Sequence, residues 1–162
     1  MTTKDCVLLA EDAGAEVDLL RWAFRKAGLP NHIIDVPDGA AVIEYLKGTT
    51  PFSDRAQYPF PRLLLLDLKM PKVDGFEVLA WLRTRLEFSS LPVVVLSSSV
   101  FQADSQKAIA LGAREFLTKP YDIKALVKLV EGVHQRWLAD EPMAVAAVAS
   151  VAQAQSRCEA NS

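Results

Sequence analysis

Cysteine is scarce in this 162-residue chain, which contains only Cys6 and Cys158. The first lies in an apolar run and the second near the C-terminus, so we expect reduced thiols and no disulfide framework. Glycine is also sparse, and no glycine-rich phosphate loop follows the first apolar run, where the sequence reads EDAGAEVD. This second absence disfavours a flavin- or nucleotide-binding domain of the α/β class.

The chain also lacks an excess of either charge and any long hydrophobic segment. Its formal net charge is −2, which gives no general attraction to nucleic acid. No apolar segment approaches the roughly 18–20 residues that a membrane-spanning helix needs, and the N-terminus has no signal-peptide pattern. These features predict a cytoplasmic protein that binds neither nucleic acid nor membrane.

Five short apolar runs alternate with five helical patterns along the chain. The runs that predict strands are Cys6–Ala10, His32–Val36, Leu63–Asp67, Pro92–Ser97 and Glu115–Thr118. The predicted helices are a stripe from Val17 to Ala27, then Asp38–Lys47, Asp74–Phe88, Gln102–Leu111 and Asp122–Ala139. Strict alternation of this kind predicts a parallel sheet with right-handed crossovers and helices on both faces.

The character of the strands predicts their order. The first, third and fourth runs (VLLA, LLLL, VVVL) are apolar without alternation, as expected of strands that are covered on both faces. The second and fifth runs are more polar and suit the sheet edges. The predicted fold is therefore α/β, a flavodoxin-like (βα)5 doubly wound parallel sheet with strand order 2-1-3-4-5. Ligands of such folds bind beyond the carboxyl ends of strands 1 and 3.

We assign residues 1–139 to one domain and residues 140–162 to a C-terminal tail. The tail contains seven alanines and few large apolar residues, so we expect it to be flexible or partly helical. About two dozen residues are too few for a helix-turn-helix output domain with its own core.

Charged and polar residues gather at the carboxyl ends of the predicted strands. Glu11 and Asp12 follow the first strand, Asp67 ends the third after four leucines, Ser97 ends the fourth, and Lys119 follows the fifth. Three neighbouring carboxylates repel one another, and a hard cation such as Mg²⁺ would remove that conflict. A hydroxyl and an ammonium nearby could contact further anionic oxygens. The arrangement suits a phosphoryl group carried on Asp67.

Four motifs in this order give the chain a specific resemblance: LLAED, DLKMPKVDG, PVVVLSSS and FLTKP. Over residues 4–139 it resembles a receiver domain of the two-component response regulator family. The proline-bearing loop at 48–61 also resembles that of single-domain regulators paired with phytochrome-type histidine kinases.

The resemblance implies a set of site residues. Asp67 would be the phosphoacceptor, and Mg²⁺ would be bound by Asp12, Asp67 and the backbone carbonyl of Lys69, with Glu11 assisting through water. Ser97 and Lys119 would contact the phosphoryl oxygens. Phe116 would be an aromatic switch that turns inward when Ser97 moves. The family more often has Thr at position 97 and often Tyr at position 116, but Ser keeps the hydroxyl and Phe keeps the ring.

Each of these residues also has a plainer interpretation. Glu11 and Asp12 could cap the first helix, Ser97 could be a turn residue, and Lys119 could be a solvated surface lysine. Phe116 could belong to the ordinary core. These interpretations would require several unrelated coincidences at one sheet edge, so we favour the joint functional one.

The sequence therefore predicts a stand-alone response regulator that signals by phosphorylation-dependent protein contact and acts on no external substrate. Its partners would be a histidine kinase and a second copy of itself, since apolar residues on the last two helices and the fifth strand exceed what one buried face needs. The candidate interface residues are Phe101, Phe116, Tyr121, Leu129 and Trp137, and Leu138 is expected at the same surface. The helical stripe expected to cover the sheet is Ile123, Leu126, Val130, Val133 and Trp137.

Two alternatives remain open at this point. One is a pseudo-receiver that binds partners without phosphorylation. The other is an aspartyl-nucleophile phosphatase or phosphotransferase, although those enzymes commonly need a second acid two residues after the nucleophile, where this chain has Lys69.

Overall fold

Five parallel strands form a single sheet in the computed structural model, which describes residues 6–139. The strand order is β2-β1-β3-β4-β5, as the sequence predicts. The strands are β1 (Cys6–Ala10), β2 (His32–Val36), β3 (Leu63–Leu66), β4 (Val93–Ser97) and β5 (Glu115–Thr118). The two more polar runs, β2 and β5, are the edges.

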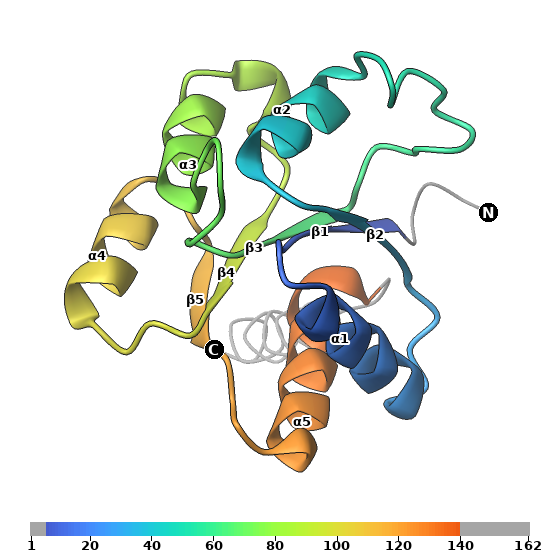
Figure 1. Cartoon of the computed structure of the whole chain (residues 1–162), viewed down its shortest axis with the longest axis vertical. Helices are drawn as coiled ribbons and strands as arrows, with labels where there is room; N and C mark the ends of the chain where they lie inside the picture. The colour runs from blue at the N-terminus through green and yellow to red at the C-terminus, as the bar shows by residue number, and fades with distance from the viewer. Residues whose placement is uncertain (1–5, 140–162) are drawn as a thin grey trace, which may run out of the picture.

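Helices cover both faces of the sheet (Figure 1). They are α1 (Gly14–Lys26), α2 (Gly39–Lys47), α3 (Gly75–Arg83), α4 (Gln102–Ala110) and α5 (Ile123–Val133). Helices α1 and α5 pack on one face, and α2, α3 and α4 pack on the other.

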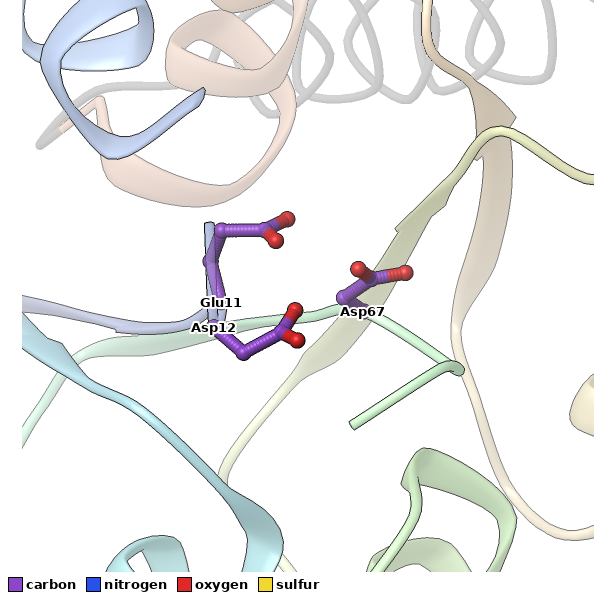
Figure 2. A group of neighbouring side chains, drawn as sticks. All are labelled: Glu11, Asp12 and Asp67. Carbon is purple, nitrogen blue, oxygen red and sulfur yellow. The ribbon is translucent and has the colours of Figure 1, made fainter. Parts of the chain in front are cut away.

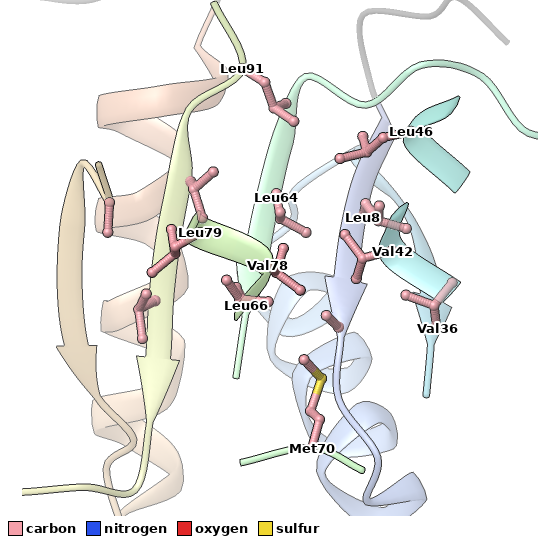
Figure 3. Packing of buried hydrophobic residues seen from close by; sticks show 14 of the residues in the cluster. Leu8, Val36, Val42, Leu46, Leu64, Leu66, Met70, Val78, Leu79 and Leu91 are labelled. Carbon is pink, nitrogen blue, oxygen red and sulfur yellow. The ribbon is translucent and has the colours of Figure 1, made fainter. Parts of the chain in front are cut away.

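The apolar runs of the central strands supply two separate cores. Leu8 and Leu64 point toward α2 and α3 (Figure 3), whereas Leu9 and Leu65 face α1 and α5. Because successive side chains of a strand alternate between faces, a strand covered on both sides must be apolar at every position. Each fully buried leucine contributes roughly 1.5–3 kcal/mol, so the strand can tolerate a carboxylate where it ends.

The start of α3 has the capping box that the sequence predicts. The Asp74 carboxylate accepts from the Glu77 backbone N–H at 2.9 Å, and the Glu77 carboxylate accepts from the Asp74 N–H at 3.3 Å. The predicted end of this helix at Phe88 is wrong, because α3 ends at Arg83. The Thr84 hydroxyl donates to the Trp81 carbonyl at 2.7 Å, and a separate 3₁₀ helix follows at Leu86–Phe88.

The last helix differs from its predicted span only in its final turns. Helix α5 runs to Val133 and continues as a π-helical segment, His134–Leu138. Among the described residues, no helix is both long enough and apolar enough to span a bilayer. The predicted tail at 140–162 lies outside the described residues.

The proline-bearing loop between α2 and β3 packs through its aromatic side chains. The buried Tyr45 ring of α2 lies 5.1 Å from the Phe52 ring and 6.1 Å from the Tyr58 ring, between centroids. The Tyr45 hydroxyl donates to the Pro59 carbonyl at 2.7 Å, and Arg55 donates to the Leu46 carbonyl at 3.0 Å. These contacts fix a connection that is longer than most in such folds.

Candidate functional site

Glu11, Asp12 and Asp67 come together at the carboxyl ends of β1 and β3 (Figure 2). One carboxylate oxygen of each lies within 4.8 Å of the other two. The parallel register brings them together, since the Asp67 N–H donates to the Ala10 carbonyl and the Glu11 N–H donates to the Val36 carbonyl, both at 3.1 Å. Glu11 and Asp67 are buried, whereas Asp12 is exposed.

The loop after β3 approaches Asp67 closely because of a glycine. A Cβ atom at Gly75 would lie 2.4 Å from the Asp67 carbonyl oxygen and 2.8 Å from the Leu68 Cα. Both neighbours are backbone atoms, which cannot move aside cheaply. Gly75 therefore allows α3 to begin directly against the segment that carries Asp67.

Lys119 reaches this cluster from the end of β5. Its backbone N–H donates to the Ser97 carbonyl at 2.8 Å, which fixes the start of the following loop. Its ammonium nitrogen lies 2.6 Å from Glu11 Oε2 and 3.4 Å from Asp67 Oδ2, and it also pairs with Glu16 in the first turn of α1. Only 15% of the Lys119 side chain is exposed, so its interpretation as a solvated surface lysine is wrong.

Glu16 is a member of the site that the sequence analysis missed. Its position five residues after Glu11, in the first turn of a helix that starts at the same sheet edge, was the available signal. An acidic residue in a first helical turn is commonplace, because it stabilises the positive end of the helix dipole. This signal alone therefore does not indicate a contact between Glu16 and Lys119.

Burial and shared hydrogen bonds shift the pKa values of these groups. Burial raises the pKa of Glu11 to about 8, although its hydrogen bond with Lys119 acts in the opposite direction. Burial also disfavours the charged form of Lys119, but its hydrogen bonds to Glu11 and Glu16 outweigh that effect and raise its pKa. Partial burial works against ionised Glu16 too, yet the Lys119 ammonium lowers the pKa of Glu16 overall.

The end of β4 and the segment after it add two buried hydroxyls. Ser97 Oγ accepts from the Ser99 N–H at 3.2 Å, and Ser99 Oγ lies 2.5 Å from Asp104 Oδ2 in α4. Beside them opens a cleft of about 570 Å³ that gives access from solvent to the sheet edge. Its lining residues are Asp12, Leu68, Lys69, Met70, Pro71, Asp74, Phe76, Ser99 and Asp104.

The donor set at this edge suits a hard divalent cation. The clustered ligand atoms are carboxylate oxygens, two of them on buried side chains that water solvates poorly. Asp12 does not cap α1, because the N-cap residue is Ala13, whose own side chain makes no capping hydrogen bond. Glu11 does take part in the helix start, since its Oε1 accepts from the Ala13 N–H at 3.1 Å.

Comparison with known proteins decides the family. The profile described as "Response regulator receiver domain" matches residues 7–131. The chain belongs to the response regulator receiver family. This membership excludes the alternative assignments to a phosphatase family or to a flavin-binding domain. It agrees with the fold and with the four motifs.

Two relatives of this receiver match over most of their length. The response regulator Rcp1 of Synechocystis is 33% identical over 132 residues, which cover 82% of this chain and 88% of Rcp1. The probable methanogenesis regulatory protein FilR2 of Methanothrix harundinacea is 34% identical over 132 residues, covering 82% and 83%.

Solved structures of other response regulators share the receiver's architecture. The phosphorylated cyanobacterial phytochrome response regulator RcpA has a TM-score of 0.76 at 31% identity, covering 85% of this chain and 96% of RcpA. The regulator RPA3017 in red light signalling of R. palustris has a TM-score of 0.80 at 31% identity, covering 84% and 95%. The Mn²⁺-bound form of Rcp1 has a TM-score of 0.74 at 32% identity, covering 85% and 96%.

The structure divides the receiver's candidate interface residues into two groups. Phe101 and Tyr121 are largely or fully exposed. Phe116, Leu129 and Trp137 are half-buried and pack against the two cores, so they offer less free surface than the sequence predicts.

Two further assignments in α5 and after it need correction. Ile123 is exposed and does not cover the sheet, because it is the first residue of α5. Leu138, expected at the surface, is buried, since the π-helical segment turns it toward the core beside α1. Trp137 is fixed by a hydrogen bond from its indole N–H to Glu115 Oε2 at 2.8 Å.

Proposed function

We propose that this receiver is a phosphorylation-controlled switch in which Asp67 accepts a phosphoryl group from a histidine kinase. The supporting observation is the position of Asp67, a buried carboxylate at the end of β3 with two carboxylates and the Lys119 ammonium around it. A buried group of this kind combines an anionic nucleophile with a cationic partner for the incoming phosphoryl oxygens.

The transfer itself is a substitution at phosphorus. An Asp67 carboxylate oxygen attacks the phosphorus of a phosphohistidine, the P–N bond breaks, and the imidazole nitrogen keeps the electron pair and takes up a proton. The product is an aspartyl phosphate. Hydrolysis later breaks the P–O bond to Asp67, with water as the nucleophile and inorganic phosphate as the product.

The acidic cluster is the proposed magnesium site. Asp12, Asp67 and the Lys69 backbone carbonyl would hold Mg²⁺, with Glu11 assisting through water. The bound cation would offset the charge of the carboxylates and of the phosphoryl oxygens. The relative Rcp1 has been solved in an Mn²⁺-bound form, which supports the binding of a divalent cation by this receiver.

The conformational response would follow from two side chains at the same sheet edge as Asp67. Ser97 and Lys119 would contact the phosphoryl oxygens, and the movement of Ser97 would draw the half-buried Phe116 ring further inward. Such contacts change an equilibrium only because they exist in one state and not in the other.

The kinase partner is proposed to be of the phytochrome type. The match to this chain covers nearly the whole of RcpA, a phytochrome response regulator, and of RPA3017, a regulator in red light signalling. The sequence resemblance of the 48–61 loop points the same way.

The output surface is proposed to be the one formed by α4, β5 and α5, where a second copy would bind. Phe101 precedes α4 and Tyr121 precedes α5, and both are exposed together with Val100 and Ile123. Phe116 lies on β5 between these segments, so a change in its ring position would alter this surface.

The decisive test is Asp67→Asn, treated with acetyl phosphate and Mg²⁺ and examined by intact-protein mass spectrometry. Wild type should gain one phosphoryl group and the variant none, while both unfold cooperatively. Asp18→Asn, which changes an exposed carboxylate of α1, is the matched control and should be labelled like wild type. Labelling of Asp67→Asn at normal stoichiometry would refute the phosphoacceptor assignment, and an unlabelled wild type would favour the pseudo-receiver.

A further inference from the structure

Three carboxylates surround a single ammonium at the site. Lys119 Nζ pairs with both Glu11 and Glu16, and these contacts are shorter than its 3.4 Å distance to Asp67 Oδ2. The ammonium is therefore bound mainly to the α1 side of the site, away from the residue that would be phosphorylated.

Glu16 differs from Glu11 and Asp67, the other two carboxylates that contact Lys119. It is not part of the acidic group that could hold a cation, and 44% of its side chain is exposed. It comes from the first turn of α1, whereas Glu11 and Asp67 lie at strand ends. Its contact with Lys119 thus has no evident part in binding metal.

We propose that Glu16 is a positioning residue that holds Lys119 on the α1 side in the unphosphorylated state and thereby weakens the binding of a phosphoryl group at Asp67. This proposal rests on the proposed function of Asp67. A phosphoryl group at Asp67 must attract Lys119 away from Glu16, so the free energy of the Glu16–Lys119 pair opposes the phosphorylated state.

The test uses beryllofluoride, which stands in for the phosphoryl group on a carboxylate, at a fixed saturating Mg²⁺ concentration. Glu16→Gln keeps the shape of the side chain and removes its charge. A half-exposed ion pair contributes modestly, so we expect beryllofluoride to bind about two- to fivefold more tightly, which corresponds to roughly 0.4–1 kcal/mol. Asp18→Asn, an equal charge change on the exposed side of α1, should leave the affinity at the wild-type value.

A double-mutant cycle separates positioning of Lys119 from simple charge repulsion. In a Lys119→Ala background, Glu16→Gln should no longer tighten beryllofluoride binding, because the ammonium that Glu16 and beryllofluoride both attract is absent. Urea unfolding of each variant shows whether it remains folded under the conditions of the assay.

The outcomes are distinct. If wild type binds beryllofluoride and Glu16→Gln binds it equally or more weakly, the role of Glu16 is refuted while Asp67 stands. An equal gain with and without Lys119 would also refute it, since Glu16 would then act only through its charge. Absence of beryllofluoride binding in wild type would overturn both this inference and the proposed function.

Discussion

Stability should fall with rising pH because Glu11 is buried. The ordinary pKa of a glutamate is 4.5, and in the folded protein that of Glu11 is raised to about 8. Between these values the folded state keeps a proton that the unfolded state has released. The free energy of unfolding therefore decreases as pH rises, by up to about 1.4 kcal/mol per pH unit, and the contribution is fully present only below pH 4.5.

The size of the effect can be bounded. If Glu11 alone bound the extra proton, the free energy of unfolding would fall by about 5 kcal/mol between the two pKa values. That is a large share of the stability of a typical domain. The other two shifted groups of the site act elsewhere on the pH scale. The lowered pKa of Glu16 matters below its ordinary value of 4.5, and the raised pKa of Lys119 matters above 10.5.

Urea unfolding, followed by tryptophan fluorescence from about pH 5 to about pH 8, measures this slope without added metal. Glu11→Gln cannot ionise, so its stability should decline less, and it should become the more stable protein at the upper end. Mg²⁺ requires the deprotonated carboxyl, so its stabilisation of wild type should grow with pH. Parallel curves for wild type and Glu11→Gln would refute the reasoning.

Two further predictions concern the cation and the output surface. Asp12→Ala should weaken Mg²⁺ binding more than Glu11→Ala, measured by tryptophan fluorescence, because we expect Glu11 to act through water; equal or reversed losses would contradict this order. Beryllofluoride should promote dimerisation in sedimentation experiments, and Phe101→Ser and Tyr121→Ser should reduce it. Leu86→Ser, an exposed apolar residue after α3, is the control, and a wild type that stays monomeric in both states would exclude the dimer.

The fold was predictable because its signals are local and repeated. Apolar runs of four or five residues define the central strands, and the Asp38 and Asp74 caps fix the starts of α2 and α3. The ends of α3 and α5 were less predictable. They depend on a Thr84 hydroxyl bond and on a π-helical segment, and neither alters the apolar periodicity on which the prediction was based.

The site was predictable as a list of strand ends but not as a set of contacts. Topology alone brings Asp12, Asp67 and Lys119 to one edge. Which carboxylates Lys119 pairs with depends on how far the Glu16 side chain extends from α1, and a sequence pattern does not encode that distance. Leu129 and Trp137 were overestimated as surface residues for the same reason, because their packing depends on how α5 lies against the sheet.

The contacts of Lys119 also explain how a charged residue, Asp67, can follow four buried leucines. The leucines hold the end of β3 rigidly, and burial makes the Asp67 carboxylate depend on its partners more than on water. In this structure one ammonium contacts all three carboxyl groups, those of Asp67, Glu11 and Glu16. A cation and a phosphoryl group would redistribute that ammonium toward Asp67 and release Glu16. Losing the Glu16 contact would cost free energy, so the contacts that Lys119 gains with the phosphoryl group must outweigh that cost for the switch to occur.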